Sequence, residues 1–303
     1  MINFKPITLS DKILYKQYLM TETERGCEYS FVNLFLWGRQ QAAILHDHLV
    51  LFSQFNRRSV YPYPMGTGDK RPVLDAIIAD ARERGIPCRI TGLNAFEKQA
   101  LEEMYPGRFR FHGARDSFDY VYDINDLADL KGGKYQRKRN HYKQFCKNYP
   151  DYTVEPLGDE NLPQVRLMLE QWFETIISEN PDEDFHMERA ALSKALKHYK
   201  ELDIEGLLLK NDDTILAVTL GSPLSFNTFD VQFEKAPRDV NGAYTAINYE
   251  FARYLRAKYP KLQFLNREED MGLEGLRKAK ERYYPHHMVE KYWACLLDDD
   301  YEY

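Results

Sequence analysis

Residues 229–234 alternate apolar side chains with polar or charged ones. A strand over these residues points successive side chains to opposite faces, so each kind of side chain has a face of its own. The apolar face carries Phe229, Val231 and Phe233, and the polar face carries Asp230, Gln232 and Glu234. The chain must therefore fold so that the polar face is either solvated or part of a functional site.

The segment from Gly272 to Tyr284 predicts a helix with a cation on its inward face. At about 100° per residue, one side of this helix collects the apolar residues Leu273, Leu276, Ala279, Tyr283 and Tyr284. Lys280 lies in the middle of that side and Arg277 lies at its edge. An unpaired buried cation costs several kcal/mol, so we expect a carboxylate beside Lys280. The candidates are the carboxylates of the 229–234 strand and those of the preceding turn, Glu268, Glu269 and Asp270.

Two interpretations of this charged region stay open. A buried cation joined to a carboxylate can be a structural ion pair that holds a strand to a helix. The same groups can also form a functional site, because both arrangements perturb the local electrostatics. The concentration of charges in one stretch of chain favours function.

Length and composition indicate a globular protein. At 303 residues the chain exceeds a common single domain, and 44% hydrophobic residues suffice for packed cores. Its four cysteines are scattered without a CxxC pair, which argues against a zinc site and suits a reducing compartment. The N-terminal residues lack the apolar core of a signal peptide, and no run approaches the ~20 apolar residues of a membrane span. We therefore expect a cytoplasmic protein whose membrane contacts, if any, are peripheral.

The predicted helices and strands follow a similar order in both halves of the chain. From Tyr152 to Leu297 the order is β-α-α-β-β-β-α-β-α-β, and from Phe4 to Tyr122 nearly the same order recurs. We predict an N-terminal domain over residues 1–128 and a C-terminal domain over residues 129–303.

This repeated order resembles tandem domains of the GNAT N-acetyltransferase fold, as in the FemABX-like aminoacyl transferases and the C-terminal domain of phosphatidylglycerol lysyltransferase. Five strings resemble, more narrowly, an uncharacterised bacterial family related to that lysyltransferase domain: KGGKYQRKRNHYKQF, VQFEKA, NGAYTAINYEFA, NREEDMGLEGLRKAK and YYPHHMVEKY. The resemblance covers nearly the whole chain. It implies an α/β (α+β) fold of two GNAT-like domains, each a mixed, mostly antiparallel sheet flanked by helices.

The resemblance also implies acyl or aminoacyl transfer to an amine or hydroxyl acceptor, with acyl-CoA or aminoacyl-tRNA as the donor. Such a reaction needs a proton acceptor, a donor for the developing oxyanion and an anchor for the acyl donor. We select as catalytic candidates Asp230, Glu234, Glu268, Asp270 and Lys280. We select as donor- or substrate-binding candidates Lys138, Arg139, Gln232, Arg238, Asn241, Gly242, Asn266, Arg267 and Arg277.

Gly242 lies where the GNAT fold often binds the pyrophosphate of coenzyme A, at the N-terminus of the helix after the fourth strand. Arg238 and Asn241 precede it, and together they could form an anion site at a helix N-terminus. The usual glycine-rich acetyl-CoA signature is incomplete here. Gly242 is therefore also open to interpretation as a plain helix-start glycine.

The stretch from Lys131 to Lys147 is basic and contains no Asp or Glu. As a helix it would turn its aromatic residues inward, with Lys138 and Arg139 beside them and the other bases outward. It could be a solvated linker helix, or it could bind a phosphate-bearing partner such as tRNA, coenzyme A or an anionic lipid surface.

Other motifs are weaker. His46-Asp47-His48 predicts a hairpin turn, and without a third ligand at a suitable spacing we expect no metal site. The strand at residues 59–64 of the N-terminal half lacks a carboxylate, and Pro62 and Pro64 place it at an edge or splay it from its neighbour. We therefore expect residues 1–128 to be non-catalytic.

A second hypothesis for the whole protein is an alternative to acyl transfer. On this hypothesis the chain is a non-catalytic module that binds RNA or an anionic surface through the basic helix.

Overall fold

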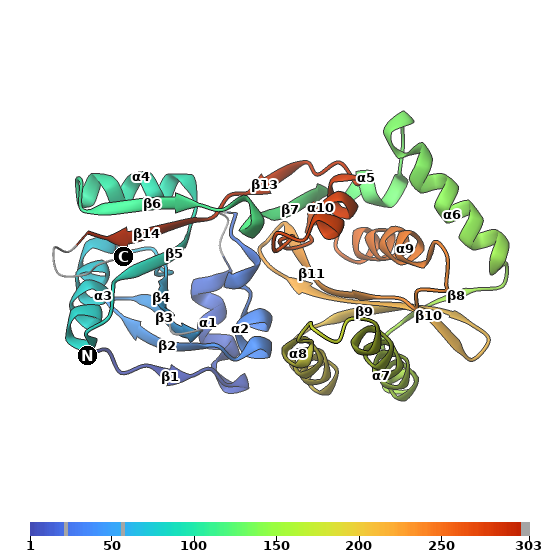
Figure 1. Cartoon of the computed structure of the whole chain (residues 1–303), viewed down its shortest axis with the longest axis horizontal. Helices are drawn as coiled ribbons and strands as arrows, with labels where there is room; N and C mark the ends of the chain where they lie inside the picture. The colour runs from blue at the N-terminus through green and yellow to red at the C-terminus, as the bar shows by residue number, and fades with distance from the viewer. Residues whose placement is uncertain (21–23, 56–57, 298–303) are drawn as a thin grey trace. The chain divides into compact units, whose positions relative to one another are not determined.

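The computed structural model describes residues 1–20, 24–55 and 58–297 (Figure 1). Its contacts divide the chain into two compact units. Unit 1 comprises residues 1–119, 269–277 and 288–303, and unit 2 comprises residues 120–268 and 278–287. The boundary between residues 128 and 129 stays a prediction about separately folding domains. The compact units differ from it because each sheet takes a strand from the other half of the sequence.

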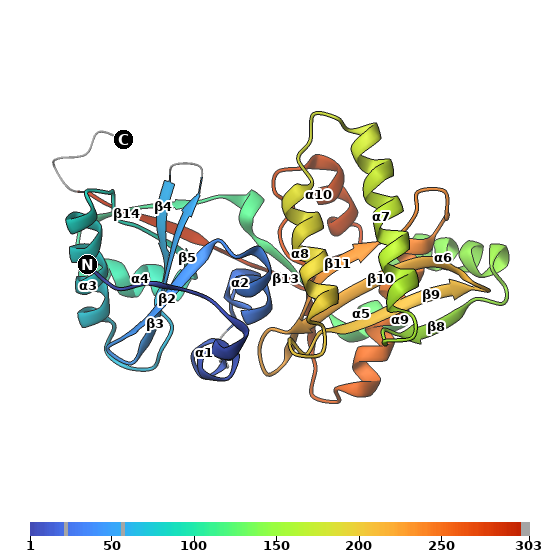
Figure 2. The same ribbon diagram turned by 90° about the horizontal axis from the view of Figure 1, so that it is seen from below.

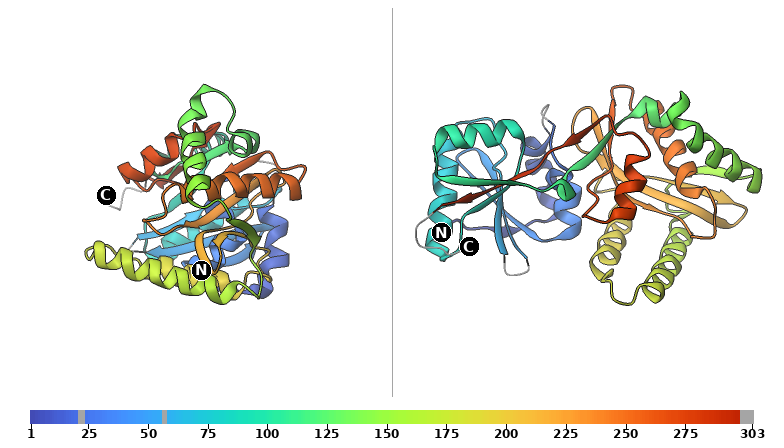
Figure 3. Two further views of the ribbon diagram at one scale, coloured as in Figure 1. Left: turned by 90° about the vertical axis from the view of Figure 1, so that its right-hand side faces the viewer. Right: turned by 45° about the horizontal axis from the view of Figure 1, so that its top comes forward.

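Unit 1 is built on a seven-stranded sheet with the order β1-β2-β3-β4-β5-β14-β6. Its neighbours pair antiparallel, except for the parallel pair β4 and β5. Figure 3 shows β14, in red, beside β6. The strands are β1 (Lys5–Pro6), β2 (Gln40–Leu45), β3 (His48–Phe55), β4 (Arg58–Pro62), β5 (Arg89–Leu93), β6 (Phe109–Gly113) and β14 (Tyr292–Leu296). The α-helices are α1 (Lys12–Leu19), α2 (Phe31–Trp37), α3 (Lys70–Arg84) and α4 (Ala95–Met104).

The core of unit 1 forms where α3 and α4 pack against the sheet. Ile77 of α3 and Leu101 of α4 are fully buried, as are Tyr61 and Ile90 of the adjoining strands. Apolar residues recur along α3 at helical spacing, so burying this one face against the sheet removes its apolar surface from water.

Unit 2 is built on a second seven-stranded sheet with the order β13-β7-β12-β11-β10-β9-β8. β11 and β12 pair in parallel, and the pairs from β11 to β8 and between β12 and β7 are antiparallel. The strands are β7 (Asp119–Asp123), β8 (Thr153–Pro156), β9 (Glu205–Asn211), β10 (Thr214–Pro223), β11 (Thr228–Lys235), β12 (Phe264–Asn266) and β13 (His287–Val289). The helices are α5 (Ile124–Asp129), α6 (Gln136–Asn148), α7 (Leu162–Glu179), α8 (His186–Lys197), α9 (Ala243–Lys258) and the second half of α10 (Glu274–Glu281), whose residues 274–277 belong to unit 1.

A β-bulge interrupts β11 at Gln232. Phe233 lies opposite Leu220 of β10, and Val231 lies opposite the next β10 residue, Gly221. Gln232 is therefore an extra residue on β11 with no opposing residue in the ladder. One extra residue reverses the alternation of side chains beyond it, because the alternation has a period of two.

The bulge corrects the expectation that Asp230 and Glu234 share a face. Glu234 lies opposite Thr219 and Asp230 lies opposite Ser222. Thr219 and Ser222 are three residues apart on one strand, so they point to opposite faces of the sheet. Asp230 and Glu234 therefore also lie on opposite faces.

Different helices cover these two faces. Phe229 packs against Phe251 of α9, with the ring centroids 6.0 Å apart. Because Asp230 follows Phe229, it points away from α9, and Glu234 points toward the α9 side. Figure 2 shows α7 and α8 in front of the opposite face of the sheet.

The sequence predicts that the strand at residues 59–64 lies at an edge or is splayed from its neighbour. It is not at an edge, since β4 lies between β3 and β5, but it leaves β3 after Val60, which agrees with the second alternative. The prolines are tolerated because the ladder with β3 ends at Val60 and the ladder with β5 spans Tyr61 and Pro62 alone. The last predicted strand, expected as one strand from Val289 to Leu297, is divided into β13 and β14. The helix at residues 272–284 is shorter, and of its predicted inward apolar side chains Leu273, Ala279 and Tyr284 are exposed.

The basic helix is confirmed as α6. Tyr135 and Phe145 are buried, Lys138 and Arg139 are half-buried beside them, and the other basic side chains are exposed. Among the described residues, no helix combines the length and the apolar composition that crossing a membrane requires.

Candidate functional site

A buried ion pair joins Glu234 of β11 to Arg267, the residue after β12. Arg267 Nη2 donates to Glu234 Oε1 at 2.9 Å, and the two side chains are only 12–13% exposed. Within the described chain, Glu234 Oε2 and Arg267 Nη1 are buried atoms with no hydrogen-bond partner. The pair thus keeps one acceptor and one donor unused.

Strand pairing explains why this ion pair forms at this place. The parallel ladder between β11 and β12 ends where Asp230 meets Asn266. Beyond that point β12 turns away, while β11 continues for five residues to Lys235. Glu268 takes up a left-handed conformation with φ of 57°, which is uncommon outside glycine and concentrates at functional sites. The side chain of Arg267 is therefore presented where the two strands diverge.

Lys138 of α6 adds a second cation to this cluster. Its ammonium group lies 3.3 Å from the centroid of the Tyr283 ring, and the Arg267 guanidinium lies 5.0 Å from the same ring. Burial, together with the positive charge of Arg267, lowers the pKa of Lys138 to about 7 against the opposing influence of Glu234. Lys138 can therefore carry or release a proton near neutral pH.

Lys280 holds the turn that carries Arg267. Its Nζ donates to the main-chain carbonyls of Arg267 at 2.5 Å and Glu268 at 3.1 Å. The side chain is buried as predicted, and its own carbonyl accepts the hydroxyl of Tyr122 at 2.9 Å. These contacts position Arg267 and give Lys280 partners of a kind that the sequence does not reveal.

Gly242 allows α6 to approach the N-terminus of α9. Its φ is +85°, and a Cβ atom there would lie 2.8 Å from the carbonyl oxygen of His141 and 3.1 Å from Cβ of Phe145. Glycine is thus required by packing at this helix start. The contact brings α6, with Lys138, beside the α9 face of the sheet.

Comparison with known proteins gives the family. A family model described as phosphatidylglycerol lysyltransferase, C-terminal, matches residues 21–295. The chain belongs to this family. An uncharacterised curated protein of Mycoplasmoides gallisepticum is 24% identical over 183 residues, which span 60% of this chain and 57% of that protein.

Solved structures extend the family assignment to the fold. A conserved protein of unknown function from Bacteroides thetaiotaomicron VPI-5482 has a TM-score of 0.92 and 38% identity, over 98% of this chain and 100% of that chain. L-PGS from Bacillus licheniformis has a TM-score of 0.68 and 16% identity, over 96% of this chain and 93% of that chain. A tandem GNAT protein from the clavulanic acid pathway has a TM-score of 0.52 and 9% identity, over 99% of this chain and 100% of that chain. The expected α/β fold with tandem GNAT-like halves is confirmed.

In this member of the lysyltransferase-domain family, other selected residues lie on the face away from α9. Asp230 and Asn266 are fully buried and adjacent in the parallel ladder. The Gln232 amide donates to Ser222 Oγ at 2.7 Å and to Asp230 Oδ2 at 3.2 Å. These residues form a buried polar network on the opposite side of the sheet from Glu234 and Arg267.

Asp270 and Arg277 contact each other within unit 1. Arg277 donates through Nε and Nη2 to the two carboxylate oxygens of Asp270, at 2.9 Å and 3.0 Å. Asp270 Oδ1 also accepts the main-chain N–H of Gly272. The pair ties the start of α10 to the turn before it, and this bidentate geometry explains both residues without a ligand.

Two of the selected binding residues have local partners, and a third is exposed. Arg139 donates to the carbonyls of Leu130 and Gly132, and so holds the turn after α5. Arg238 pairs with Glu179 of α7 at the surface, and Asn241 is exposed. The proposed anion site formed by Arg238, Asn241 and Gly242 stays a prediction.

Sequence reasoning missed Tyr283 and Tyr122 as site residues. The Arg267 guanidinium lies 5.8 Å from the ring centroid of Tyr122. Burial raises the pKa of Tyr283 to about 12, against the opposing influence of the positive charge of Arg267. Both residues looked like ordinary core tyrosines, and the only available signal was their position beside the charged segments.

A buried charge cluster in unit 1 was also missed. Cys27, Asp119 and Glu269 each offer a possible metal-ligand atom, and these atoms lie within 4.8 Å of one another. Lys291 Nζ lies among them, 2.6 Å from Asp119 Oδ1 and 3.3 Å from Glu269 Oε2. The ammonium group thus occupies the place that a metal cation would take.

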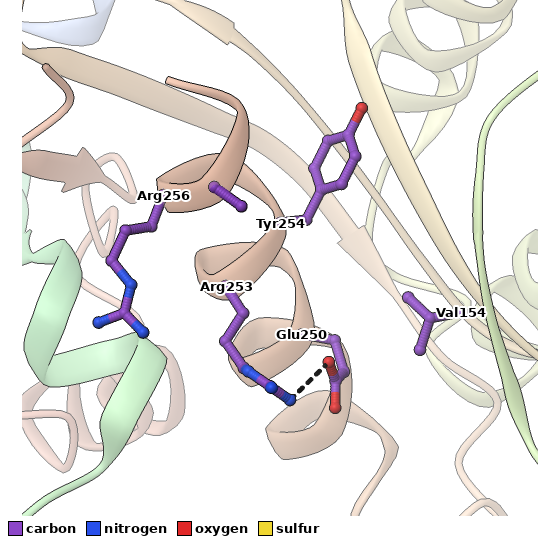
Figure 4. A pocket seen from close by; sticks show the side chains of 6 residues that line it. Val154, Glu250, Arg253, Tyr254 and Arg256 are labelled. Carbon is purple, nitrogen blue, oxygen red and sulfur yellow. Dashed lines mark hydrogen bonds and ion pairs between the residues drawn. The ribbon is translucent and has the colours of Figure 1, made fainter. Parts of the chain in front are cut away.

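A surface groove lies on the outer part of α9, beside β8 (Figure 4). Its volume is about 600 Å³, and it is lined by Val154, Glu250, Arg253, Tyr254, Arg256 and Ala257. The Glu250 carboxylate already accepts the hydroxyls of Tyr142 and Tyr152. None of the residues selected from the sequence lines this groove.

Proposed function

We propose that this chain is an acyl- or aminoacyl-transferase whose reaction centre is formed by Glu234, Arg267 and Lys138. The observation that carries the proposal is the unused buried donor and acceptor, Arg267 Nη1 and Glu234 Oε2. Buried polar atoms nearly always have partners, so an unused pair at one ion pair favours a polar ligand. A carbonyl oxygen of the ligand can accept from Arg267 Nη1, and an amine or hydroxyl hydrogen of the ligand can be donated to Glu234 Oε2.

The proposed reaction joins the acceptor to the acyl group. The acceptor nitrogen or oxygen attacks the carbonyl carbon, and the bond from that carbon to the donor's leaving group then breaks. Arg267 Nη1 donates to the carbonyl oxygen as it becomes negative. Neutral Lys138 accepts the proton that the acceptor loses and returns it to the leaving group. Glu234 Oε2 accepts a hydrogen bond from the acceptor and orients it.

The leaving group distinguishes two donors. From an acyl-CoA it is a thiol, and from an aminoacyl-tRNA it is a ribose hydroxyl. The family description names a lysyltransferase, which supports an aminoacyl donor. The exposed bases of α6 suit the phosphates of such a donor, and they also suit a peripheral anionic lipid surface.

The test is a donor screen with mass-spectrometric detection of the product. The purified chain is incubated with acetyl-CoA or with charged tRNAs, each with amine, peptide and lipid acceptors. We expect transfer from one donor class and at least about a hundredfold loss in Arg267→Lys, which keeps the charge but loses the guanidinium geometry. Arg253→Lys, in the surface groove, is the matched control. Absence of product with every donor would contradict the proposal.

A second candidate function rests on α6 alone. This helix carries several exposed bases and no acidic residue, which favours binding of RNA or an anionic surface without catalysis. Such a module would bind tRNA equally well whether or not it is charged, and would leave the aminoacyl ester intact. Cytoplasmic localisation stays a prediction under both functions.

A further inference from the structure

Unit 1 contains a second buried cluster of charges, beside its own parallel strand pair. Tyr63 follows β4, and Glu97 lies in the first turn of α4, which follows β5. Arg25 pairs with Glu97, and their side chains are 12% and 7% exposed. Lys70, the first residue of α3, lies 5.9 Å from the centroid of the Tyr63 ring.

The positive charge in this cluster exceeds the negative charge. Lys70 Nζ donates to the carbonyl of Gly66 at 2.5 Å, which is a neutral acceptor. Glu97 is shared, because its second oxygen accepts the N–H of Asn94 at 3.0 Å as part of the helix cap. Among the residues that the structure describes, Arg25 and Lys70 therefore share the carboxylate of Glu97. Burial, together with the positive charge of Arg25, lowers the pKa of Lys70 to about 8 against the opposing influence of Glu97.

An unused donor accompanies this excess charge. Arg25 Nε is buried and, in the part of the chain that the structure describes, has no hydrogen-bond partner. The guanidinium therefore engages Glu97 through one edge and keeps an N–H for another acceptor. A buried guanidinium N–H without an acceptor is costly, so the geometry calls for an oxyanion or water at this place.

We infer that Arg25 and Lys70 form a second ligand site in unit 1, which binds the phosphate group of a small molecule. A phosphate offers three oxygens and up to two negative charges, so it can accept from the guanidinium and the ammonium together. Its negative charge would offset the positive charge of Arg25 and Lys70 that the single carboxylate of Glu97 does not neutralise. The site repeats the composition of the unit 2 cluster: a buried arginine–glutamate pair and a lysine over a tyrosine ring, beside a parallel strand pair.

This inference adds a binding role to residues 1–128, which we expect to be non-catalytic. In the sequence, the helix after the 59–64 strand has no inward cation as clear as Lys280. In the structure its first residue, Lys70, is half-buried, and Arg25 reaches the same place from a distant segment. The inferred role is binding, so it does not depend on the transfer reaction proposed for unit 2.

The test is isothermal titration calorimetry of the full chain with inorganic phosphate and with pyrophosphate. We expect binding that weakens at least about tenfold in Lys70→Gln and in Arg25→Gln. The matched control is Arg82→Gln, which removes one exposed cation from the same helix, α3. Arg267→Gln in unit 2 should leave this phosphate binding unchanged. Equal binding by all these variants, or loss in Arg267→Gln alone, would overturn the inference.

A second measurement does not depend on variants that may fold poorly. The groups that face Lys70 are Arg25, Glu97, Tyr63, the Gly66 carbonyl and His48. A bound phosphate adds negative charge beside Lys70 and so favours its protonated form. At pH 8 binding should therefore take up protons, seen as a heat that varies with the ionisation enthalpy of the buffer. Phosphate binding that releases protons at this pH would contradict the role of Lys70.

Discussion

The ammonium group of Lys138 lies 3.3 Å from the ring centroid of Tyr283. This contact takes one cation of an otherwise exposed basic helix and places it beside Glu234 and Arg267. The aromatic face partly replaces the water that Lys138 loses on burial, although it does not restore the full solvation of a charge. The same helix therefore carries basic side chains in two environments: Lys138 is turned inward, and several other bases remain in solvent.

Transfer activity should rise with pH as Lys138 loses its proton. Its pKa of about 7 means that the neutral form, which accepts the acceptor's proton, grows as the pH passes 7. The variant Lys138→Arg stays charged and should lose this rise. The measurement is the pH profile of kcat/KM between pH 6 and 9. Lys143→Arg, at an exposed position of α6, should keep the wild-type profile.

The free energy of unfolding should also rise with pH because of Lys138. The folded-state pKa, about 7, lies below the ordinary value for lysine, so between these values the unfolded state binds more protons. The free energy of unfolding should therefore rise with pH above about 7 by more in the wild type than in Lys138→Met. Urea denaturation of both proteins at pH 7 and pH 9 checks this difference. Identical pH dependence would show that Lys138 is not perturbed in the folded state.

Lys280→Met should loosen the turn that carries Arg267. The substitution keeps an unbranched side chain of similar size but removes the ammonium group that donates to the carbonyls of Arg267 and Glu268. We expect a loss of about 2–4 kcal/mol in the free energy of unfolding. In the folded fraction kcat should fall while KM changes little, since Arg267 acts on the transition state. A merely structural Lys280 would reduce stability and leave kcat intact.

Gly242→Ala should be more costly than Gly38→Ala. Both glycines have positive φ, but a Cβ atom at Gly242 meets His141 O at 2.8 Å, whereas nothing lies within 4 Å of one at Gly38. Strain alone should cost about 1 kcal/mol at either position, and crowding should add about 1–3 kcal/mol at Gly242. Denaturant unfolding of both variants gives the comparison. Equal losses would mean that α6 does not pack closely on α9.

The exposed bases of α6 should govern capture of a polyanion. The triple variant Arg137→Gln, Lys143→Gln, Lys147→Gln removes three exposed cations and leaves Tyr135 and Phe145 buried. Thermal stability should change little. Binding of tRNA should weaken. The slope of the logarithm of the binding constant against the logarithm of the salt concentration should become shallower by about one for each lost phosphate contact. An unchanged salt slope excludes this surface as the binding face.

Local patterns in the sequence predicted most elements and the inward position of individual cations. The helical spacing of α6 indicated that Tyr135 and Phe145 are buried with Lys138 at their margin, and both expectations are confirmed. The inward position of Lys280 is confirmed as well. These features depend on periodicity, and a periodic pattern can be read along the chain without knowing its partners.

Tertiary structure alone decided which polar groups meet. The bulge at Gln232 reversed the alternation in β11, so Glu234 joined Arg267 while Asp230 joined the opposite face. A bulge depends on how β10 and β11 align, so it cannot be predicted from the alternation of residues 229–234 alone. Two acceptors of Lys280 are main-chain carbonyls, and a sequence pattern does not show which carbonyl a side chain will meet. The pairing of Arg25 with Glu97 joins residues 72 apart in the chain, so only folding could bring them together.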